Sequence, residues 1–393
     1  MRALLRLAVV GLALLALPAT ASAEKKAIWG PVTLPDGSSA FPLYNELGVD
    51  VLQVSLNWSE VATERPGRAI DPADPVYRWP AELDEAVARA STHGIDVAIL
   101  VIGTPGWANG GRTSVWAPND AEDYAKFVRA ASRRYPSVDH WMIWGEPTRV
   151  GNFQPLPRDS RVGPRRYAKL LDAAYEQLKR EDSDNVVIGG MSYSSGDVKP
   201  TDWLRWMRLP NGLPPRLDLY GHNPFSERFP DIDKKPYRKG VRDISDIDSF
   251  HRQLQRDYGP SVNKEIHRQL RRDHDRYDSL EDHPEVNRRH KELHKANRWI
   301  HGLLRKKGPD LWLSEYTIGS APMDEFPFST TLEGQARWLS AAYELAQEAK
   351  YVETLGWFSL LDAPATEEGG SKLGLMTFEG ARKPAFSAYR DVP

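Results

Sequence analysis

Cysteine is absent from this sequence of 393 residues. Without thiols the protein has no disulfide framework, no cysteine nucleophile and no cysteine-ligated zinc or iron–sulfur site. An excess of charge of one sign is also missing, because 52 lysines and arginines stand against 54 aspartates and glutamates, a formal net charge of −2. Proteins that neutralise phosphates concentrate positive charge, so this composition argues against nucleic acid as a partner.

Long apolar runs are confined to the first 23 residues. Arg2 and Arg6 precede an apolar stretch from Leu7 to Leu17, and Ala21-Ser22-Ala23 forms a small-residue cleavage site. This pattern predicts a secretory signal peptide over residues 1–23, too short for a stable membrane span. No later run approaches the roughly 18 apolar residues that a span needs. We therefore expect a secreted, extracytoplasmic protein without a membrane span, in which residues 24–393 form a single domain.

What the sequence does contain is an alternation of short β-rich apolar runs with amphipathic helical stretches. Such alternation is typical of βα units around a parallel sheet. Eight strands are predicted, at Ala27–Trp29, Val51–Leu56, Val97–Ile102, Trp141–Trp144, Val186–Gly189, Leu217–Gly221, Leu311–Ser314 and Thr354–Ser359. No glycine-rich phosphate loop follows the first strand, so a closed (β/α)8 TIM barrel is favoured over a doubly wound sheet.

Two of the predicted helices have clear starts, and one region departs from the βα rhythm. Asn119-Asp120 precedes a helix predicted over 121–135, and Thr330-Thr331 precedes one over 334–348. Residues from about 226 to 300 carry interleaved charges of both signs and most of the ten histidines. We interpret this region as a charged helical insertion after strand six. Its histidine spacing does not match the zinc-protease helix, so no metal site is expected there.

Two carboxylates stand at the carboxyl ends of predicted strands, where the active site of such a barrel is built. Glu146 follows strand four and Glu315 ends strand seven. Since side chains alternate along a strand, Glu146 is expected on the face of Trp144, and Glu315 on the face of Leu313. If that face is the lumen, both carboxylates enter the barrel mouth. Burial there would raise the pKa of one acid while nearby donors keep the other ionised, as glycoside hydrolysis requires.

The residues around these acids resemble a known family. The segment 141–147, WMIWGEP, resembles the strand-four signature of the clan A glycoside hydrolases, and 312–316, WLSEY, is similar to their strand-seven signature. Tyr220-Gly221-His222, Gly356-Trp357 and the ending 383–386, KPAF, also match. Within the clan the sequence looks closest to glycoside hydrolase family 39 and related family 5-like secreted proteins.

The resemblance implies a retaining hydrolase with Glu146 as acid/base and Glu315 as nucleophile, and it requires no metal or organic cofactor. One residue departs from the pattern, because the clan normally has asparagine before the acid/base and this chain has Gly145. In the family that asparagine bonds the sugar 2-hydroxyl, a contact that strengthens in the transition state. A neighbour such as Asn57 or Asn223 then supplies the amide, the sugar is held differently, or the activity is weak.

Further polar and aromatic residues near the predicted strand ends are candidates for binding a carbohydrate. They are Asn57, Trp58, Trp107, His222, Asn223 and Trp357. The tryptophans would stack on sugar rings, and His222 would hydrogen-bond Glu315. These candidates and the two acids each have a structural alternative. The acids could pair with arginines, and the tryptophan rings could pack in the core. His222 could be a core histidine with satisfied hydrogen bonds, and the asparagines could cap strands and turns.

Three functions remain open at this point. The first is a secreted glycoside hydrolase that cleaves O-glycosidic bonds in a β-linked oligo- or polysaccharide. The second is a non-catalytic carbohydrate-binding barrel, which the glycine at position 145 keeps open. The third is a surface interaction protein in which the inserted helices do the binding.

Overall fold

The protein is represented by a computed structural model that describes residues 24–227, 232, 234–236, 238–259, 308–323, 328–364 and 370–392. The predicted signal peptide lies outside the described residues, as does most of the predicted insertion, so the third hypothesis concerns residues that are not described. None of the helices in the described segments is long and apolar enough to cross a membrane.

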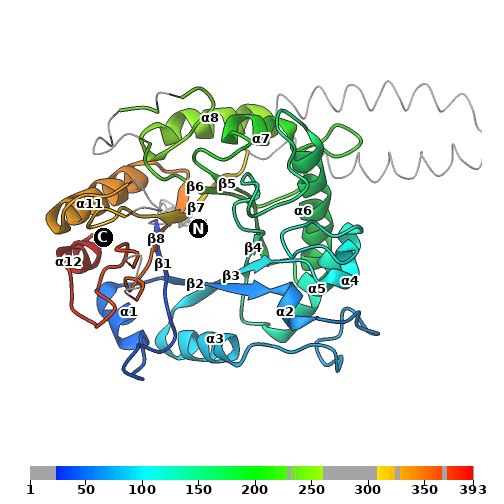
Figure 1. The fold of residues 1–393 in the computed structure, drawn as a ribbon, viewed down its shortest axis with the longest axis horizontal. Coiled ribbons are helices and arrows are strands. Elements are labelled where there is room, and N and C mark those ends of the chain that lie inside the picture. The colour runs from blue at the N-terminus through cyan, green and yellow to red at the C-terminus, as the bar shows by residue number, and fades with distance from the viewer. Residues whose placement is uncertain are drawn as a thin grey trace, which may run out of the picture.

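Eight parallel strands form a closed barrel in sequence order, with the last strand pairing the first. Figure 1 shows them as a central ring surrounded by helices. The strands are β1 Lys25–Trp29, β2 Val51–Asn57, β3 Asp96–Ile102, β4 His140–Ile143, β5 Val186–Tyr193, β6 Leu219–Asn223, β7 Asp310–Tyr316 and β8 Val352–Phe358. The predicted (β/α)8 barrel is confirmed, and each predicted strand overlaps an observed one.

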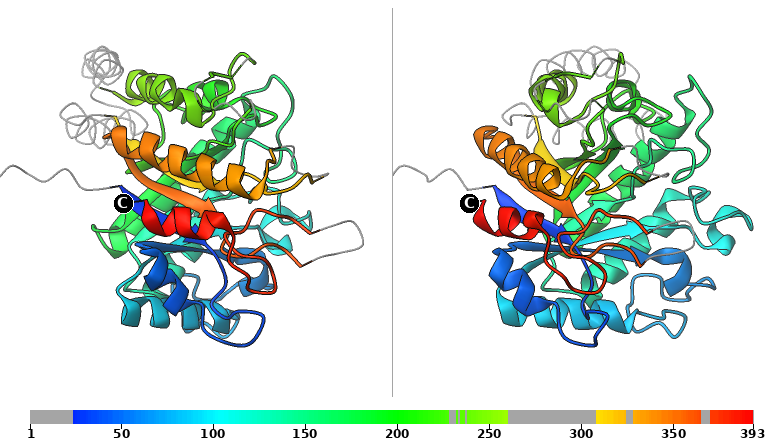
Figure 2. Two further views of the ribbon diagram at one scale, coloured as in Figure 1. Left: turned by 90° about the vertical axis from the view of Figure 1, so that its left-hand side faces the viewer. Right: turned by 60° about the vertical axis from the view of Figure 1, so that its left-hand side comes forward.

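Helices cover the outside of the barrel, and Figure 2 shows α11 and α12 side by side there. The helices are α1 Phe41–Leu47, α2 Trp58–Val61, α3 Ala81–His93, α4 Gly106–Asn109, α5 Ala121–Arg134, α6 Val162–Glu181, α7 Pro200–Trp206, a 3₁₀ turn Ile244–Asp246, α8 Ile247–Tyr258, α11 Leu332–Glu348 and α12 Pro384–Asp391. Both predicted starts are confirmed, because the Asp120 side chain accepts from the Glu122 amide at 3.0 Å and Thr331 accepts from Gly334 at 3.0 Å.

The lumen of the barrel is filled with side chains and is not a pore. A buried cluster occupies it, made of Ala27, Trp29, Val51, Ala98, Leu100, Met142, Ile188, Met191 and Trp312. Alternate residues of the same strands pack outward against the helices in a second and larger cluster. The polar residues at the carboxyl ends of the strands therefore lie directly above this layer of apolar side chains.

A buried ion pair joins the loops that follow the last two strands. Lys383 Nζ lies 2.5 Å from Asp362 Oδ1, and these side chains are only 3% and 2% exposed. Lys383 also donates to the Gly374 carbonyl at 2.9 Å and to Ser320 Oγ at 3.1 Å. Because Asp362 and Gly374 come from the loop after β8 and Ser320 from the loop after β7, this ion pair ties the two loops together at the barrel mouth.

Replacing Lys383 by methionine is expected to destabilise the protein by about 3–5 kcal/mol, because it leaves the Asp362 carboxylate buried without its cation. Urea unfolding measures the loss. The matched control is Lys25→Met, which removes an exposed pair with Asp96 (N–O distance 2.9 Å) and is expected to cost less than about 1 kcal/mol. Equal losses in the two variants would contradict a structural role for the buried pair.

Candidate active site

Glu315 reaches the barrel mouth through a bulge in β7. Leu313 pairs with Leu355 and Tyr316 with Trp357, so three steps along β7 match two along β8. Leu313 and Tyr316 both pack outward in the helix-facing cluster. The extra residue therefore turns both Ser314 and Glu315 toward the lumen. The expectation that Glu315 shares the face of Leu313 is wrong; it reaches the mouth because the alternation is interrupted.

Gly356 provides the space for this bulge. A Cβ at position 356 would lie 2.3 Å from the Ser314 carbonyl oxygen and 2.3 Å from Gln53 Nε2. The same carbonyl accepts hydrogen bonds from Trp29 Nε1 at 2.9 Å and from Gln53 Nε2 at 2.8 Å. Side chains of β1 and β2 thus hold the backbone next to Glu315 from across the lumen. Only glycine fits at position 356, against this carbonyl group.

Glu146 is placed by two left-handed residues rather than by strand alternation. Strand β4 ends at Ile143, and Trp144 and Glu146 have φ angles of 66° and 43°. Trp144 packs outward against Phe153 and Tyr124, so the expectation that Glu146 shares its face is also wrong. Non-glycine residues in this region cost of order 1–3 kcal/mol each. The protein tolerates this cost in the turn that directs the Glu146 carboxylate toward the barrel mouth.

The carboxylate of Glu146 is 7% exposed and hydrogen-bonded at both oxygens. Oε1 accepts from Asn223 Nδ2 at 2.9 Å, while Oε2 accepts from Arg149 Nη1 at 2.8 Å and from Asn152 Nδ2 at 3.4 Å. Asn223 is oriented in turn by Ser314, whose hydroxyl donates to Asn223 Oδ1 at 2.6 Å. The acceptor end of the amide is therefore occupied, and its NH₂ group faces the carboxylates.

The same Asn223 amide also interacts with the half-buried Glu315 side chain, so one amide links the two acids. Burial and the nearby Glu146 charge raise the pKa of Glu315 to about 8, while the Arg149 cation and the Asn223 hydrogen bond lower it. Two carboxylates that share a site do not both ionise readily. Burial and the neighbouring carboxylate therefore favour the protonated form of Glu315, while the Arg149 ion pair lies on Glu146. The resemblance implied the opposite assignment, with Glu146 as the protonated acid.

Tyr193 completes the polar wall of the site. It ends β5 beside Asn223 on β6, and the Arg149 guanidinium lies 4.9 Å from the centre of its ring. Burial, and next the Glu146 charge, raise the pKa of its hydroxyl to about 12. Tyr193 is therefore a neutral hydrogen-bonding group and a platform for Arg149.

Two of the predicted sugar-stacking tryptophans are buried in the outer core. Trp58 packs against Trp107 and Phe127 with ring centroids 5.4 and 5.7 Å apart. Trp357 is fully buried and contacts Tyr316 edge to face, on the helix side of β8. Neither ring faces the mouth, so the prediction that they stack on a substrate is wrong for both.

Trp107 is partly exposed, but one of its faces is covered. The Arg65 guanidinium lies 4.4 Å from the centre of its ring, and its Nε1 donates to the Ala62 carbonyl at 2.8 Å. The exposed aromatic at the end of β8 is Phe358, which is 36% exposed and 6.4 Å from the Trp29 ring. Sequence reasoning missed Phe358, although it shares the lumen-facing side of β8 with Gly356.

Asn57 has a structural role as a helix cap. Its Oδ1 accepts from the Ser59 amide at 3.1 Å and from Ser59 Oγ at 2.8 Å, while its Nδ2 donates to Glu60 at 2.7 Å. All its polar atoms are used in starting α2. It is not the amide that replaces the family asparagine, and the alternative interpretation as a cap is confirmed.

His222 is fully buried and does not make the expected hydrogen bond to Glu315 among the described contacts. Its Nδ1 lies 2.8 Å from Ser192 Oγ and 2.8 Å from the Ser192 carbonyl, and its Nε2 lies 3.2 Å from the Arg242 carbonyl. Burial lowers its pKa to about 3. His222 is therefore a neutral core residue that ties β6 to β5 and to the loop before α8, as the alternative interpretation held.

Asn223 is the predicted binding residue that the structure brings to both acids. Sequence reasoning missed three residues around it: Ser314, which orients Asn223, Arg149, which pairs with Glu146, and Tyr193, which lies beside Asn223 in the sheet. Arg149 could have been found from its spacing, since it follows Glu146 by three residues and ion-pairs with it. Tyr193 and Ser314 gave no comparable signal, because their positions depend on the strand register.

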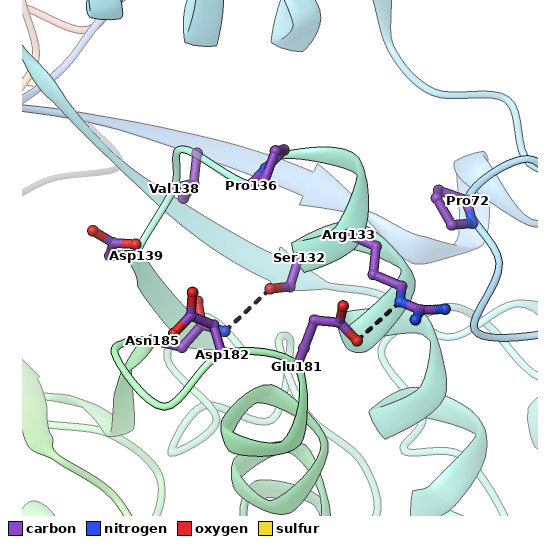
Figure 3. A pocket seen from close by; sticks show the side chains of 9 residues that line it. All are labelled: Pro72, Ser132, Arg133, Pro136, Val138, Asp139, Glu181, Asp182 and Asn185. Atoms are coloured by element: carbon purple, nitrogen blue, oxygen red, sulfur yellow. Dashed lines mark hydrogen bonds and ion pairs between the residues drawn. The ribbon is translucent and has the colours of Figure 1, made fainter.

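A hollow of about 420 Å³ lies at the opposite end of the barrel (Figure 3). It is lined by residues that precede β4 and β5, such as Asp139 and Asn185. Figure 3 shows two pairs among its polar groups, Asn185 with Ser132 at 3.1 Å and Arg133 with Glu181 at 2.9 Å. We therefore place the candidate site at Glu146 and Glu315 and not in this hollow.

Comparison with known proteins finds similarity in structure but not in sequence. No protein-family model and no curated protein sequence matches the chain. A family 39 glycoside hydrolase from the gut symbiont Bacteroides cellulosilyticus WH2 superposes with a TM-score of 0.61 at 15% identity, over 95% of this chain and 64% of that one.

Two further solved structures agree. The family 39 enzyme from Xanthomonas axonopodis pv. citri gives a TM-score of 0.56 at 16% identity, over 94% of this chain and 67% of that one. A monomeric β-xylosidase from Caulobacter crescentus CB15 gives 0.55 at 16% identity, over 93% and 67%. The chain thus spans about two thirds of the length of these enzymes. It has the barrel fold of family 39 glycoside hydrolases, the family that its strand-four and strand-seven motifs resemble.

Proposed function

We propose that this protein is a secreted, retaining glycoside hydrolase that cleaves O-glycosidic bonds of a β-linked oligo- or polysaccharide. The observation that carries the proposal is the pair of acids at the ends of β4 and β7, held at the mouth of the barrel by the single amide of Asn223. The fold, shared with family 39 enzymes, supports the same conclusion. Secretion rests on the signal-peptide pattern of residues 1–23.

In the proposed mechanism Glu315 attacks the anomeric carbon while Glu146 donates a proton to the departing oxygen. The resulting glycosyl-enzyme ester is hydrolysed by a water molecule whose proton Glu146 takes up. The first step needs Glu315 ionised and Glu146 protonated, so a proton favoured on Glu315 must move to Glu146 before it. Carboxyl groups about 5–5.5 Å apart suit this route, whereas an inverting enzyme needs roughly 6.5–9.5 Å for a water molecule.

Gly145 leaves one wall of the proposed sugar site open. A Cβ there would lie 3.3 Å from Leu100 Cδ2 and 3.7 Å from Ile102 Cγ2, above the lumen face of β3. An asparagine at this position would project over that wall. Here the amide comes from Asn223 on β6, on another side of the mouth, so we propose that the sugar is held from that side.

The proposed roles are tested by trapping the covalent intermediate with an activated deoxyfluoro β-xyloside and locating the label by mass spectrometry. We expect the label on Glu315, together with products that keep the anomeric configuration. A label on Glu146 would reverse the roles, and an inverted product would exclude the double-displacement route.

Replacing Glu146 by alanine is expected to lower kcat/KM by about 10²–10⁴-fold for glycosides with poor leaving groups, because their departure needs a proton donor. Dinitrophenyl glycosides, which leave without protonation, are expected to react nearly normally, and added azide should speed release of the glycosyl intermediate. The matched control is Glu333→Gln, at an exposed position in the first turn of α11. Equal losses with both kinds of leaving group would contradict an acid/base role.

The second candidate, a non-catalytic carbohydrate-binding barrel, is favoured by the Arg149–Glu146 ion pair, which occupies the proposed acid. Calorimetric titration with xylo- and cello-oligosaccharides, alongside product analysis, separates the two. Binding without any released sugar at any pH supports the binding protein.

A further inference from the structure

Arg149 ion-pairs with Glu146, the proposed acid. Asn223 donates to Oε1 of this carboxylate at 2.9 Å, and Arg149 donates to Oε2 at 2.8 Å. An arginine only donates, and it is never deprotonated in proteins. A cation in direct contact favours the ionised form of a carboxyl group. Departure of Arg149 therefore favours the protonated Glu146 that the first chemical step needs.

We propose that Arg149 is a positioning residue that holds Glu146 as a carboxylate in the free protein and leaves it when a sugar occupies the mouth. This inference rests on the proposed function. On departure of Arg149 the O–H bond of Glu315 breaks and an O–H bond forms on Glu146, directly or through water. The net charge of the pair stays the same, and both acids reach the states that the first chemical step requires.

Arg149 is the donor that can move, and Asn223 is the one that cannot. Asn223 is fully buried within β6 and held by the 2.6 Å hydrogen bond from Ser314. The Arg149 side chain is 49% exposed and extends from the loop after β4, close to the place where a sugar's leaving group would lie. Displacing a half-exposed arginine breaks one ion pair, whereas displacing the buried Asn223 amide would break its hydrogen bonds with both Ser314 and Glu146.

A second set of partners for the Arg149 guanidinium lies next to Glu146. Its position 4.9 Å from the centre of the Tyr193 ring already provides a cation–π contact. The exposed carboxylate of Asp197 accepts from the Val150 amide at 2.8 Å and acts on the charge of Arg149. Arg149 can therefore exchange Glu146 for Asp197 while remaining over Tyr193. The swing needs no rearrangement of the barrel.

The titratable groups facing this site define what a change of pH reports. They are Glu146, Glu315, Asp197, Glu227 and the neutral Tyr193, and Glu227 is ion-paired with Arg238. Arg149 is the cation that acts directly on the paired acids, where it opposes the effect of burial on Glu315. Removing it favours the protonated form of the pair. Its loss should therefore change the pH at which the enzyme works, besides its rate.

The test compares Arg149→Gln and Arg149→Lys with Arg65→Gln, which removes another arginine that lies over an aromatic ring near the mouth. The probe is an aryl β-xyloside, and the measurement is kcat/KM from pH 4 to 10. We expect Arg149→Gln to move both limbs of the profile upward by about one pH unit. Arg149→Lys should restore most of the shift, and Arg65→Gln should leave the profile unchanged. A profile of Arg149→Gln that coincides with that of the wild type, or falls equally at every pH, would overturn the proposal.

A second measurement separates this proposal from the proposed function. Carbon-detected NMR of the glutamate carboxyls follows the proton on the pair without any turnover. In Arg149→Gln we expect the proton of the pair to lie more on Glu146 than in the wild type, because the cation that pairs with the Glu146 carboxylate is gone. If the wild type hydrolyses no glycoside, the proposed function fails, while an unchanged titration in the variant refutes the role of Arg149 alone.

Discussion

Replacing Glu315 by glutamine is expected to lower turnover roughly 10⁴-fold or more while sugar binding stays close to normal. The amide cannot attack the anomeric carbon, yet it keeps the size and the hydrogen bonds of the side chain. Steady-state rates and calorimetric binding of xylo-oligosaccharides measure the two effects. Release of sugar at the wild-type rate from the purified variant would remove Glu315 from the mechanism.

The same variant is expected to be more stable than the wild type at alkaline pH. Because burial and Glu146 raise the pKa of Glu315 from its ordinary 4.5 to about 8, the folded protein keeps a proton that the unfolded chain loses. The contribution of Glu315 to stability is therefore complete below pH 4.5 and is lost progressively as the pH rises to about 8. Glutamine removes this loss.

Thermal unfolding at pH 5 and pH 9 tests the sign of this effect. We expect the Tm advantage of Glu315→Gln to be larger at pH 9, by about 2–4 °C for each kcal/mol regained. Glu333→Gln on the exposed surface of α11 should show no such difference. An advantage that is larger at pH 5 would contradict the raised pKa.

Adding a single methyl group at Gly356 is the second change with a large expected effect. The Cβ of Gly356→Ala would lie 2.3 Å from the Ser314 carbonyl oxygen and 2.3 Å from Gln53 Nε2, so the bulge in β7 must shift. Overpacking of this kind costs about 1–3 kcal/mol. A displacement of about 1 Å at a reacting group can lower the rate around 10²-fold, so activity should fall further than stability.

Gly151→Ala is the matched control, because this glycine lies in the loop after β4 and a Cβ there has no heavy atom within 4 Å. Chemical denaturation and kcat/KM are measured on both variants. If Gly356→Ala kept wild-type activity, the bulge would not be what positions Glu315.

The order of the strands and the two acids at their ends could be predicted from the sequence, because both follow from local patterns. A strand buried on both faces reads as a continuous apolar run, and a charge directly after it marks the strand end. The faces of Glu146 and Glu315 could not be predicted. Alternation would have placed them with Trp144 and Leu313, and the left-handed turn and the bulge leave no mark in the residue types.

The aromatic residues show the same limit in another form. Trp58 and Trp357 lie at predicted strand ends, and their chemistry suits a sugar platform as well as a core. Which use applies depends on whether the ring faces the lumen or the helices, and one residue of register decides that. Phe358 faces the mouth and Trp357 does not, although they are neighbours in the chain.

The interrupted alternation in β7 also has a consequence for how such a site is lost or gained. Deleting Ser314 would restore regular pairing with β8 and leave Glu315 as the single lumen-facing residue between Leu313 and Tyr316, without the hydroxyl that orients Asn223. A descendant of this gene could thus retain the glutamate codon and the barrel while losing, through a single three-nucleotide deletion, the hydrogen bond that fixes the amide between the two acids. For this chain, counting residues between paired positions is a more informative check on inherited activity than finding the glutamate itself.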